Sequence, residues 1–215
     1  MYLPQQFEET RLDVLHQLIR SHAFGTFVIP GDAELVANHM PFLVSPGGGP
    51  AGTLHAHVAR SNPVWKQLGK PVEALVVFQG PESYITPSWY PSKHADGKAV
   101  PTWNYAVVHA YGHPRSIEDP AWLLEHVTQL TAQHESGQAL PWQVSDAPQD
   151  YRDQMIARIV GIEIPISRIQ GKWKVSQNRQ LADRLGVAAG LQSRATEQSL
   201  AMAELVLQRA RSSTP

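Results

Sequence analysis

The chain has no cysteine among its 215 residues. This absence excludes disulfides, thiolate zinc sites, cysteine-ligated iron–sulfur clusters and cysteine nucleophiles. The chain also has little net charge, since 18 Lys and Arg residues oppose 19 Asp and Glu residues, so no global basic field attracts nucleic acid. No apolar run approaches the ~18 residues of a membrane helix, and the N-terminus lacks the basic start and apolar run of a signal peptide. We therefore expect a cytoplasmic protein with no membrane partner.

The chain does have enough apolar sequence for a large core, with 42% hydrophobic and 17% charged residues. That balance is typical of a folded chain rather than a disordered one. Leucine and isoleucine at helical spacing predict a helix over 7–22. Asp119-Pro120 predicts the start of a second helix, with an N-cap Asp and Pro at the first helical position. Further helices are expected over 148–158 and 179–215.

Strand-like patterns fill much of the remaining sequence. Alternating or continuous apolar residues predict strands, and Gly or Pro at Gly80-Pro81 and Gln170-Gly171 predicts turns. No internal repeat is present, and no linker divides the chain cleanly. The sequence therefore predicts an α+β fold or a helix-decorated barrel. The expected strands are 24–29, 34–44 with a break at Pro41, 53–58, 74–78, 83–86, 105–111 and 160–166.

Unusual polar and aromatic residues gather in five short segments near expected strand ends. Cations there suit a phosphate, hydroxyls add hydrogen bonds, and aromatic rings suit a flat ligand. The alternative is that the rings are core and the cations are solvated, and the residues alone leave both interpretations open. The cations are Arg60, Lys93, Lys174 and Arg179, the hydroxyls are Ser88, Thr102 and Ser176, and the rings are Trp89, Tyr90 and Trp103.

These segments, taken in order, resemble the PaiB family of FMN-binding negative transcriptional regulators. The resemblance covers nearly the whole chain, through Met1-Tyr2-Leu3-Pro4 and the segments 38–42, 57–63, 84–90, 100–105, 159–164 and 174–178. It implies an FMN-binding split β-barrel of the pyridoxamine-phosphate-oxidase-like kind with added helices, α+β or mainly β. We expect the barrel over 1–178 and a C-terminal helical extension over 179–215. Such barrels are usually homodimers that hold FMN at the subunit interface.

The resemblance also implies which residues bind the cofactor. It places 54–63 at the phosphate-binding strand and turn of the fold, so Arg60, Ser61 and Asn62 are the expected phosphate contacts, beside His57 and Ala59. No catalytic residue is implied, since the cofactor supplies the flavin chemistry. The implied function is a flavin-dependent oxidoreductase acting on an unidentified small substrate, or a flavin-linked negative regulator. The other cofactor-binding candidates are Ser88, Trp89, Lys93, Thr102, Trp103, Asn104 and Lys174.

Two other interpretations stay open at this point. His55 and His57 share one side of a strand, which suggests half of a haem or metal site with His39 or His109, although we expect no metal and favour a structural or flavin-edge role for His57. The segment 180–188 resembles half of a helix-turn-helix, but 188–191 lacks the polar residues that read bases. A regulator without flavin is therefore the alternative, and direct DNA binding is an open question.

Overall fold

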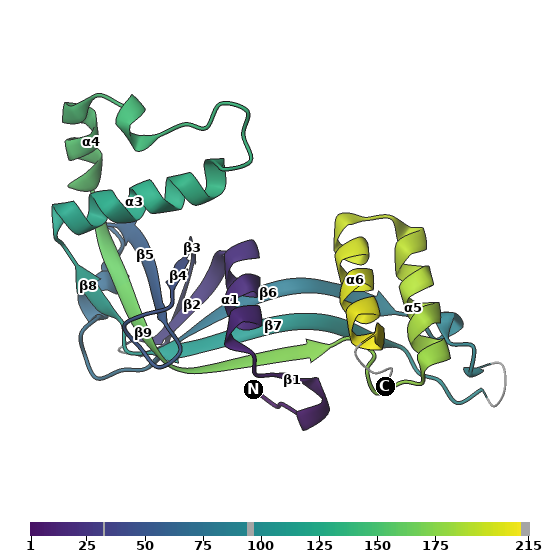
Figure 1. The fold of residues 1–215 in the computed structure, drawn as a ribbon. Helices are drawn as coiled ribbons and strands as arrows, with labels where there is room; N and C mark the ends of the chain where they lie inside the picture. The colour runs from purple at the N-terminus through teal and green to yellow at the C-terminus, as the bar shows by residue number, and fades with distance from the viewer. Residues whose placement is uncertain (32, 94–96, 212–215) are drawn as a thin grey trace. The chain divides into compact units, whose positions relative to one another are not determined.

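The computed structural model describes residues 1–31, 33–93 and 97–211 (Figure 1). Its α-helices are α1 (Leu12–Ser21), α3 (Pro120–Glu135), α4 (Gln149–Ile156), α5 (Leu181–Arg194) and α6 (Glu197–Arg211). Short 3-10 turns are η1 (Gln5–Phe7), η2 (Pro63–Gln67), η3 (Pro87–Trp89) and η4 (Val144–Asp146). The strands are β1 (Glu8–Glu9), β2 (Phe24–Pro30), β3 (Leu35–Pro41), β4 (Leu43–Ser45), β5 (Thr53–Ala59), β6 (Ala74–Ile85), β7 (Thr102–Gly112), β8 (Arg115–Ile117) and β9 (Ile159–Lys174).

The strands form one sheet in the order β3-β2-β6-β7-β9-β5-β4, with β1 and β8 also paired to β9. The neighbouring pairs β2–β3, β2–β6, β4–β5 and β5–β9 are antiparallel. Strands and helices alternate irregularly along the chain, without the regular crossovers of a parallel sheet. The α+β class predicted from the sequence is therefore confirmed.

The described residues divide into two compact units, and three long strands contribute to both. The terminal unit comprises Met1–Leu15, Gln79–Val108 and Gln170–Pro215, and the central unit comprises His16–Phe78 and His109–Ile169. The helices α5 and α6 belong to the terminal unit together with β1. The expected boundary between 178 and 179 stays a prediction.

The core of the central unit follows from strand alternation. On β5, Leu54, Ala56 and Val58 are buried in the core, while His55 and His57 lie on the opposite face. Further into the core, the Phe42 and Phe78 rings meet edge to face at 5.6 Å between centroids. Helix α3 begins as predicted, because the Asp119 carboxylate accepts a hydrogen bond from the Ala121 N–H at 3.1 Å.

Two turns predicted from Gly and Pro are wrong. β6 continues through Gly80-Pro81, and β9 continues through Gln170-Gly171, so Lys174 lies on a strand and not beyond a hairpin tip. Gly171 has a different role: a Cβ there would overlap the Leu15 side chain and crowd the Glu9 carbonyl oxygen of β1. The glycine permits a close approach between β9 and its neighbours.

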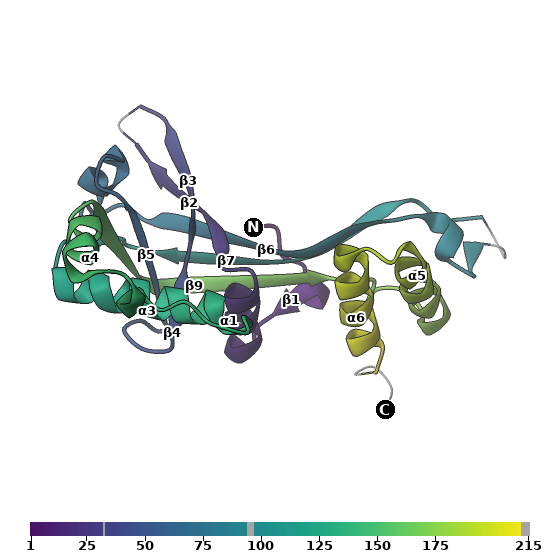
Figure 2. The same ribbon diagram turned by 90° about the horizontal axis from the view of Figure 1, so that it is seen from above.

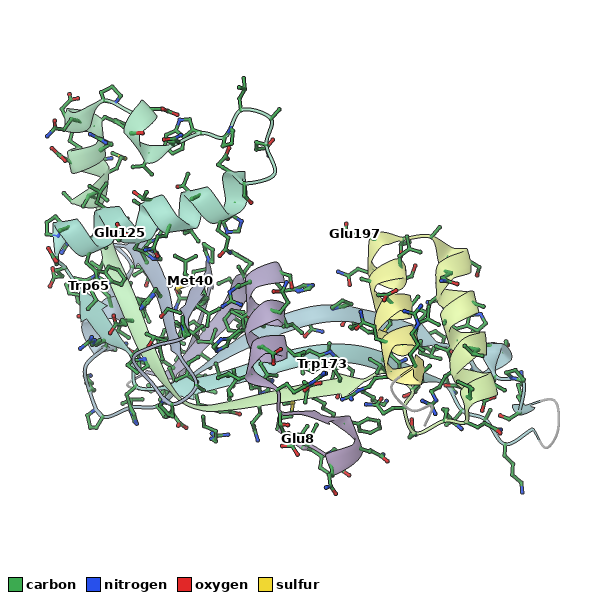
Figure 3. All side chains as sticks on the ribbon, viewed as in Figure 1. Glu8, Met40, Trp65, Glu125, Trp173 and Glu197 are labelled. Carbon is green, nitrogen blue, oxygen red and sulfur yellow. The ribbon has the colours of Figure 1, made fainter. Side chains whose placement is uncertain are left out.

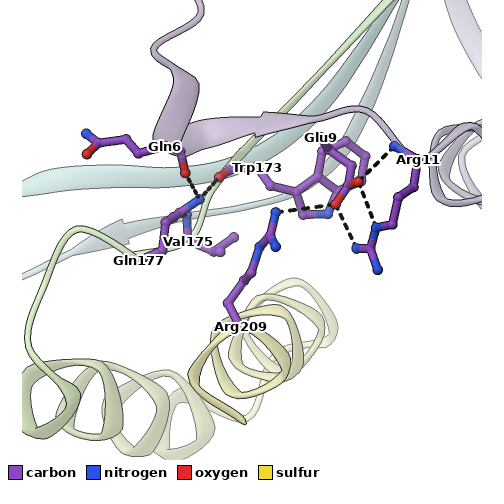
Figure 4. Close-up of polar contacts among 7 residues, drawn as sticks. All are labelled: Gln6, Glu9, Arg11, Trp173, Val175, Gln177 and Arg209. Atoms are coloured by element: carbon purple, nitrogen blue, oxygen red, sulfur yellow. Dashed lines mark hydrogen bonds and ion pairs between the residues drawn. The ribbon is translucent and has the colours of Figure 1, made fainter. Parts of the chain in front are cut away.

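The terminal unit is closed by the N-terminal segment and the last two helices. α5 and α6 lie side by side and are joined by Ala195, which adopts the left-handed conformation with φ 53° (Figures 1 and 2). The buried Glu9 carboxylate accepts hydrogen bonds from Arg11 and also pairs with Arg209 of α6 at 3.4 Å (Figure 4). The Arg11 guanidinium lowers the pKa of Glu9, so this carboxylate ties β1 to α6 as an anion.

Among the described helices, none is both long enough and apolar enough to span a membrane.

Candidate functional site

The terminal unit presents a sheet face that combines aromatic rings and lysines. α5 and α6 lie on one side of β6, β7 and β9 (Figure 2). Alternation along β6 and β7 turns Ser83 and Asn104 inward and Tyr84 and Trp103 outward. Trp103 is 52% exposed, whereas Asn104 is 1% exposed. We call the outward set the aromatic face: it consists of Tyr2, Tyr84, Trp103, Tyr105, Lys172 and Lys174.

Two rings form the exposed part of the aromatic face. Tyr84 of β6 and Trp103 of β7 meet edge to face, with centroids 6.2 Å apart and planes at 72°. Tyr84 is 39% exposed. Exposed aromatic side chains on adjacent strands form a wall against which a flat ring system can pack. This arrangement suits the heteroaromatic ligand that the sequence suggested.

The two lysines supply positive charge to the same face. Lys172 is 7% exposed; its ammonium donates to the Tyr2 carbonyl oxygen at 3.0 Å and lies 5.3 Å from the Tyr105 ring centroid. Lys174 is half-buried, and its ammonium donates to the Thr102 hydroxyl. Burial lowers the pKa of Lys174, and the nearby Lys172 ammonium lowers it further.

In the part of the chain that the structure describes, no carboxylate pairs with Lys172 or Lys174. An ammonium removed from water is normally compensated by an anion. Lys174 is matched only by a neutral hydroxyl, so its environment favours a bound anion. Lys174 and Thr102, two of the residues predicted from sequence, are therefore brought together as a phosphate-compatible pair.

Asn104 lies behind the aromatic face and not on it. Its Nδ2 donates to the Ser176 hydroxyl at 2.9 Å, and Ser176 adopts φ 64°. Within the described residues, Oδ1 of Asn104 is buried without a partner. A buried unpaired acceptor is uncommon in folded proteins. The observed bond fits a structural role for Asn104, and its predicted contact with a flavin stays a prediction.

The segment after β6 packs against α5. The Trp89 ring lies beneath the Arg194 guanidinium at 4.4 Å; Gly190 leaves space for the ring, and Gly186 leaves space for the Trp89 carbonyl oxygen. Trp89 therefore serves as a packing residue in this unit, although the sequence offered it as a ring wall. Ser88 is exposed and Lys93 is half-buried; their predicted cofactor contacts stay predictions.

The predicted phosphate turn lies in the central unit. The Arg60 guanidinium is already engaged: it donates to the Glu118 carboxylate at 2.6 Å and to the carbonyl oxygens of Ala157 and Ile159 at 3.0 and 3.1 Å. Trp65, labelled in Figure 3, lies beside this turn, and its indole N–H donates to the Arg60 carbonyl oxygen at 2.9 Å. These contacts hold the end of β5 to β9. Three of the five guanidinium N–H groups are used in this way.

The neighbours of Arg60 complete the same turn. Ala59 and Ser61 are exposed. The Asn62 side chain donates to Asn38 Oδ1 of β3 at 2.7 Å and accepts from the Val64 N–H at 3.0 Å. Asn62 thus fixes the turn to β3 and starts η2. Its role toward a phosphate stays a prediction, as do those of Ala59, Arg60 and Ser61.

Half-buried His57 pairs with the buried His126, a contact that the sequence did not reveal. His57 Nδ1 lies 3.1 Å from Nε2 of His126 on α3, and Trp122 stacks on His126 at 5.3 Å. Burial lowers the pKa of both histidines, and the neighbouring His57 and His55 add to the effect on His126, whose pKa falls to about 3. The pair is therefore neutral at physiological pH. The spacing of Trp122 and His126, four residues apart on a predicted helix, was the available signal.

The histidines considered as partners of a metal lie elsewhere. His39 stacks on Phe24 at 6.4 Å, and His109 lies beside Tyr111 at 6.3 Å. Across residues 1–31, 33–93 and 97–211, no group of three or more His, Asp or Glu side chains is arranged to hold a metal ion.

The structure thus sorts the predicted residues into two sets. The terminal unit holds Thr102, Trp103 and Lys174, with Asn104 behind them and Ser88, Trp89 and Lys93 in the segment after β6. The central unit holds His57, Ala59, Arg60, Ser61 and Asn62. Sequence reasoning missed Tyr84, Tyr105 and Lys172 as site residues. The alternation of 103 with 105 and of 172 with 174 could have identified the last two.

Comparisons with known proteins complete the description. A family model described as "Putative FMN-binding domain" matches residues 1–168. The chain is 35% identical to an uncharacterized protein of Emericella nidulans over an alignment of 244 positions, which covers 97% of each chain. It is 31% identical over 206 residues to protease synthase and sporulation protein PAI 2 of Bacillus subtilis, covering 96% of each.

Among solved structures, the chain is similar to the FAD and haem binding protein from Mycobacterium smegmatis. The TM-score is 0.58 at 14% identity, over 78% of this chain and 73% of that one. A likeness at this identity shows the fold. It confirms the split-barrel fold that the sequence resemblance implied.

Proposed function

Since the chain belongs to the PaiB-type family of FMN-binding domains, we propose that it binds FMN and works as a flavin-dependent redox protein or a flavin-linked negative regulator of transcription. The observation that carries the proposal is the half-buried Lys174 ammonium beside the Thr102 hydroxyl, with no carboxylate partner among the described residues. Thr102 directly precedes Trp103, which forms the exposed aromatic wall with Tyr84. An anion site adjoining a ring wall matches a flavin phosphate.

The residues of the aromatic face, together with Thr102 at the start of β7, fit the two ends of FMN. Lys174 and Thr102 provide a charge-assisted donor and a hydroxyl for the phosphate. Trp103 and Tyr84 provide an apolar wall for the isoalloxazine ring, and Lys172 adds positive charge held in place by Tyr2 and Tyr105. FMN supplies the redox chemistry when bound. The chain binds it, orients it and restricts water on one side.

The proposal includes a homodimer. The aromatic face carries two large rings that are 39% and 52% exposed, and a second copy covering this face would bury them and exclude water from the ligand. The proposal also includes the cytoplasmic location predicted from the sequence. Direct DNA binding is left to experiment, because the formal charge of −1 supplies no general attraction for nucleic acid.

The proposal is tested by absorbance spectroscopy of the purified protein and titration with FMN and riboflavin. We expect flavin bands or saturable FMN binding. Lys174→Met should lower the affinity for FMN by roughly tenfold to a hundredfold, since a charge-assisted hydrogen bond contributes about 1.5–3 kcal/mol. Riboflavin lacks the phosphate, so its affinity should not change. Lys66→Met, which removes an exposed lysine from η2, is the matched control.

Each other outcome has a defined meaning. If the wild-type protein binds neither flavin, the proposal is refuted, and the interpretation as a regulator without flavin is then favoured. If Lys174→Met lowers the affinities for FMN and riboflavin equally, Lys174 does not contact the flavin phosphate. Arg60→Met in the same titration tests the turn predicted from sequence. A Soret band would instead support haem, and the pair of neutral imidazoles at His57 and His126 would be examined next.

A further inference from the structure

The helix α5 lies beyond residue 168, where the match to the family model ends. Four residues of α5 contact the segment 83–92, which comprises the end of β6 and the residues that follow it. They are Asp183, Gly186, Gly190 and Arg194. We propose that α5 is a positioning element of the flavin site: it fixes the segment 83–92 and thereby sets the place of the Tyr84 ring on the aromatic face. For its ligand, this inference rests on the proposed function.

The first contact holds the end of β6. Nη1 of Arg194 donates to the Ser83 hydroxyl at 3.1 Å and to the Tyr84 carbonyl oxygen at 3.0 Å. The Tyr84 side chain lies on the opposite face of the strand, against Trp103. The backbone that Arg194 binds therefore carries the ring wall on its other side. A shift of this backbone moves the wall directly.

The second contact is steric. A Cβ on Gly190 would overlap the Trp89 ring, and a Cβ on Gly186 would overlap the Trp89 carbonyl oxygen. These glycines are four residues apart, so they share one face of α5 with Arg194. The Arg194 guanidinium lies 4.4 Å from the Trp89 ring centroid. The indole is thus confined between the helix backbone and a cation.

The third contact closes the far end of the segment. Asp183 is 2% exposed, and its carboxylate accepts the Ser92 N–H at 3.0 Å and the Ser92 hydroxyl at 2.8 Å. Hydrogen bonds to a buried carboxylate are stronger than bonds between neutral groups. The segment is consequently held at both ends and in the middle by one helix face. This is the support that a precisely placed binding wall requires.

Gly190→Ala tests the inference because it adds one methyl group under Trp89. We expect faster amide hydrogen exchange across 83–92, since the segment must move away from α5. The affinities for FMN and for riboflavin should both fall by about tenfold, so that the ratio of the two affinities is unchanged, because the ring wall and not the phosphate contact is displaced. The ratio separates this effect from that of Lys174→Met. Gly137→Ala, where an added Cβ meets nothing within 4 Å, is the control.

Arg194→Met provides a second variant that adds no bulk. It keeps the apolar stem and removes the hydrogen-bond donors to Ser83 and Tyr84. It should therefore also speed amide hydrogen exchange at 83–85 and lower the affinity for both flavins. Gln192→Met, exposed on the same helix, should do neither. Unchanged exchange and unchanged flavin affinities in folded Gly190→Ala and Arg194→Met proteins would overturn the inference. If wild-type protein binds no flavin, the proposed function fails and the exchange data alone decide whether α5 positions the segment.

Discussion

Acid should destabilise the folded protein through His126 of α3, a buried histidine that pairs with half-buried His57 of β5. His126 Nε2 lies 3.1 Å from His57 Nδ1 and its ring is stacked against Trp122, while the His55 ring meets Trp122 edge to face at 5.7 Å between centroids. The Glu163 carboxylate lies 3.6 Å from His55, and it is already paired with Arg115. Protonation of His126 thus places a charge in a buried position, where burial disfavours the charged form.

The size of the effect follows from the pKa difference between the folded and unfolded chains. Burial, then His57, then His55, lower the pKa of His126 from 6.5 to about 3. The folded state then binds fewer protons than the unfolded state, so stability falls as the pH drops below 6.5 and the loss is complete near pH 3. Linkage gives about 2 kcal/mol lost between pH 7.5 and 5, and roughly 5 kcal/mol at the acid limit.

Urea denaturation at pH 7.5 and pH 5 measures this loss. His126→Phe keeps a ring against Trp122 and removes the titrating group, so its free energy of unfolding should fall by about 2 kcal/mol less than that of the wild type over the same interval. His134→Phe, which replaces an exposed histidine of the same helix, should retain the full wild-type dependence. An identical pH dependence in wild type and His126→Phe would refute the reasoning.

Two further substitutions probe the packing described above. Gly161→Ala should destabilise the protein by about 1–3 kcal/mol, because the added Cβ overlaps the Trp122 ring; urea titration measures it, and an unchanged midpoint would show that Trp122 moves freely. Glu9→Gln should cost about 1–3 kcal/mol at pH 7, because it removes the charge that Arg11 and Arg209 share. The loss should shrink as the pH falls through the lowered pKa of Glu9, and a loss that does not depend on pH would contradict this account.

Much of the fold could be predicted because local signals and tertiary contacts agree. The N-cap of α3 works as its sequence suggests, with Asp119 bonded to Ala121. The strand predicted over 53–58 is present as β5, and Leu54 and Ala56 are buried on it. The turn predictions at Pro81 and Gly171 failed because β6 and β9 continue through these residues. At Gly171 the missing side chain permits close packing, which a single sequence does not distinguish from a turn.

The candidate site was harder to predict, since it depends on which cations are already paired. Both Arg60 and Lys174 are candidate cations in the sequence, and Arg60 is an expected phosphate contact. In the structure, Arg60 donates to Glu118 and two carbonyl oxygens, whereas Lys174 meets only the Thr102 hydroxyl among the described residues. Trp89 likewise has the residue type of a ring wall but packs on α5. Such partners come from distant parts of the chain, so spacing along the sequence does not reveal them.

Strand β9 has a consequence for how this protein can evolve. It runs from Ile159 to Lys174 and so crosses residue 168, where the family match ends. The part beyond that point pairs with β1 and carries Lys172 and Lys174. A recombination event at the edge of the matched region would cut a hydrogen-bonded strand in two and separate both lysines from Thr102 and Tyr105. The C-terminal region is therefore expected to be inherited together with the rest of the chain, and not exchanged as an independent module.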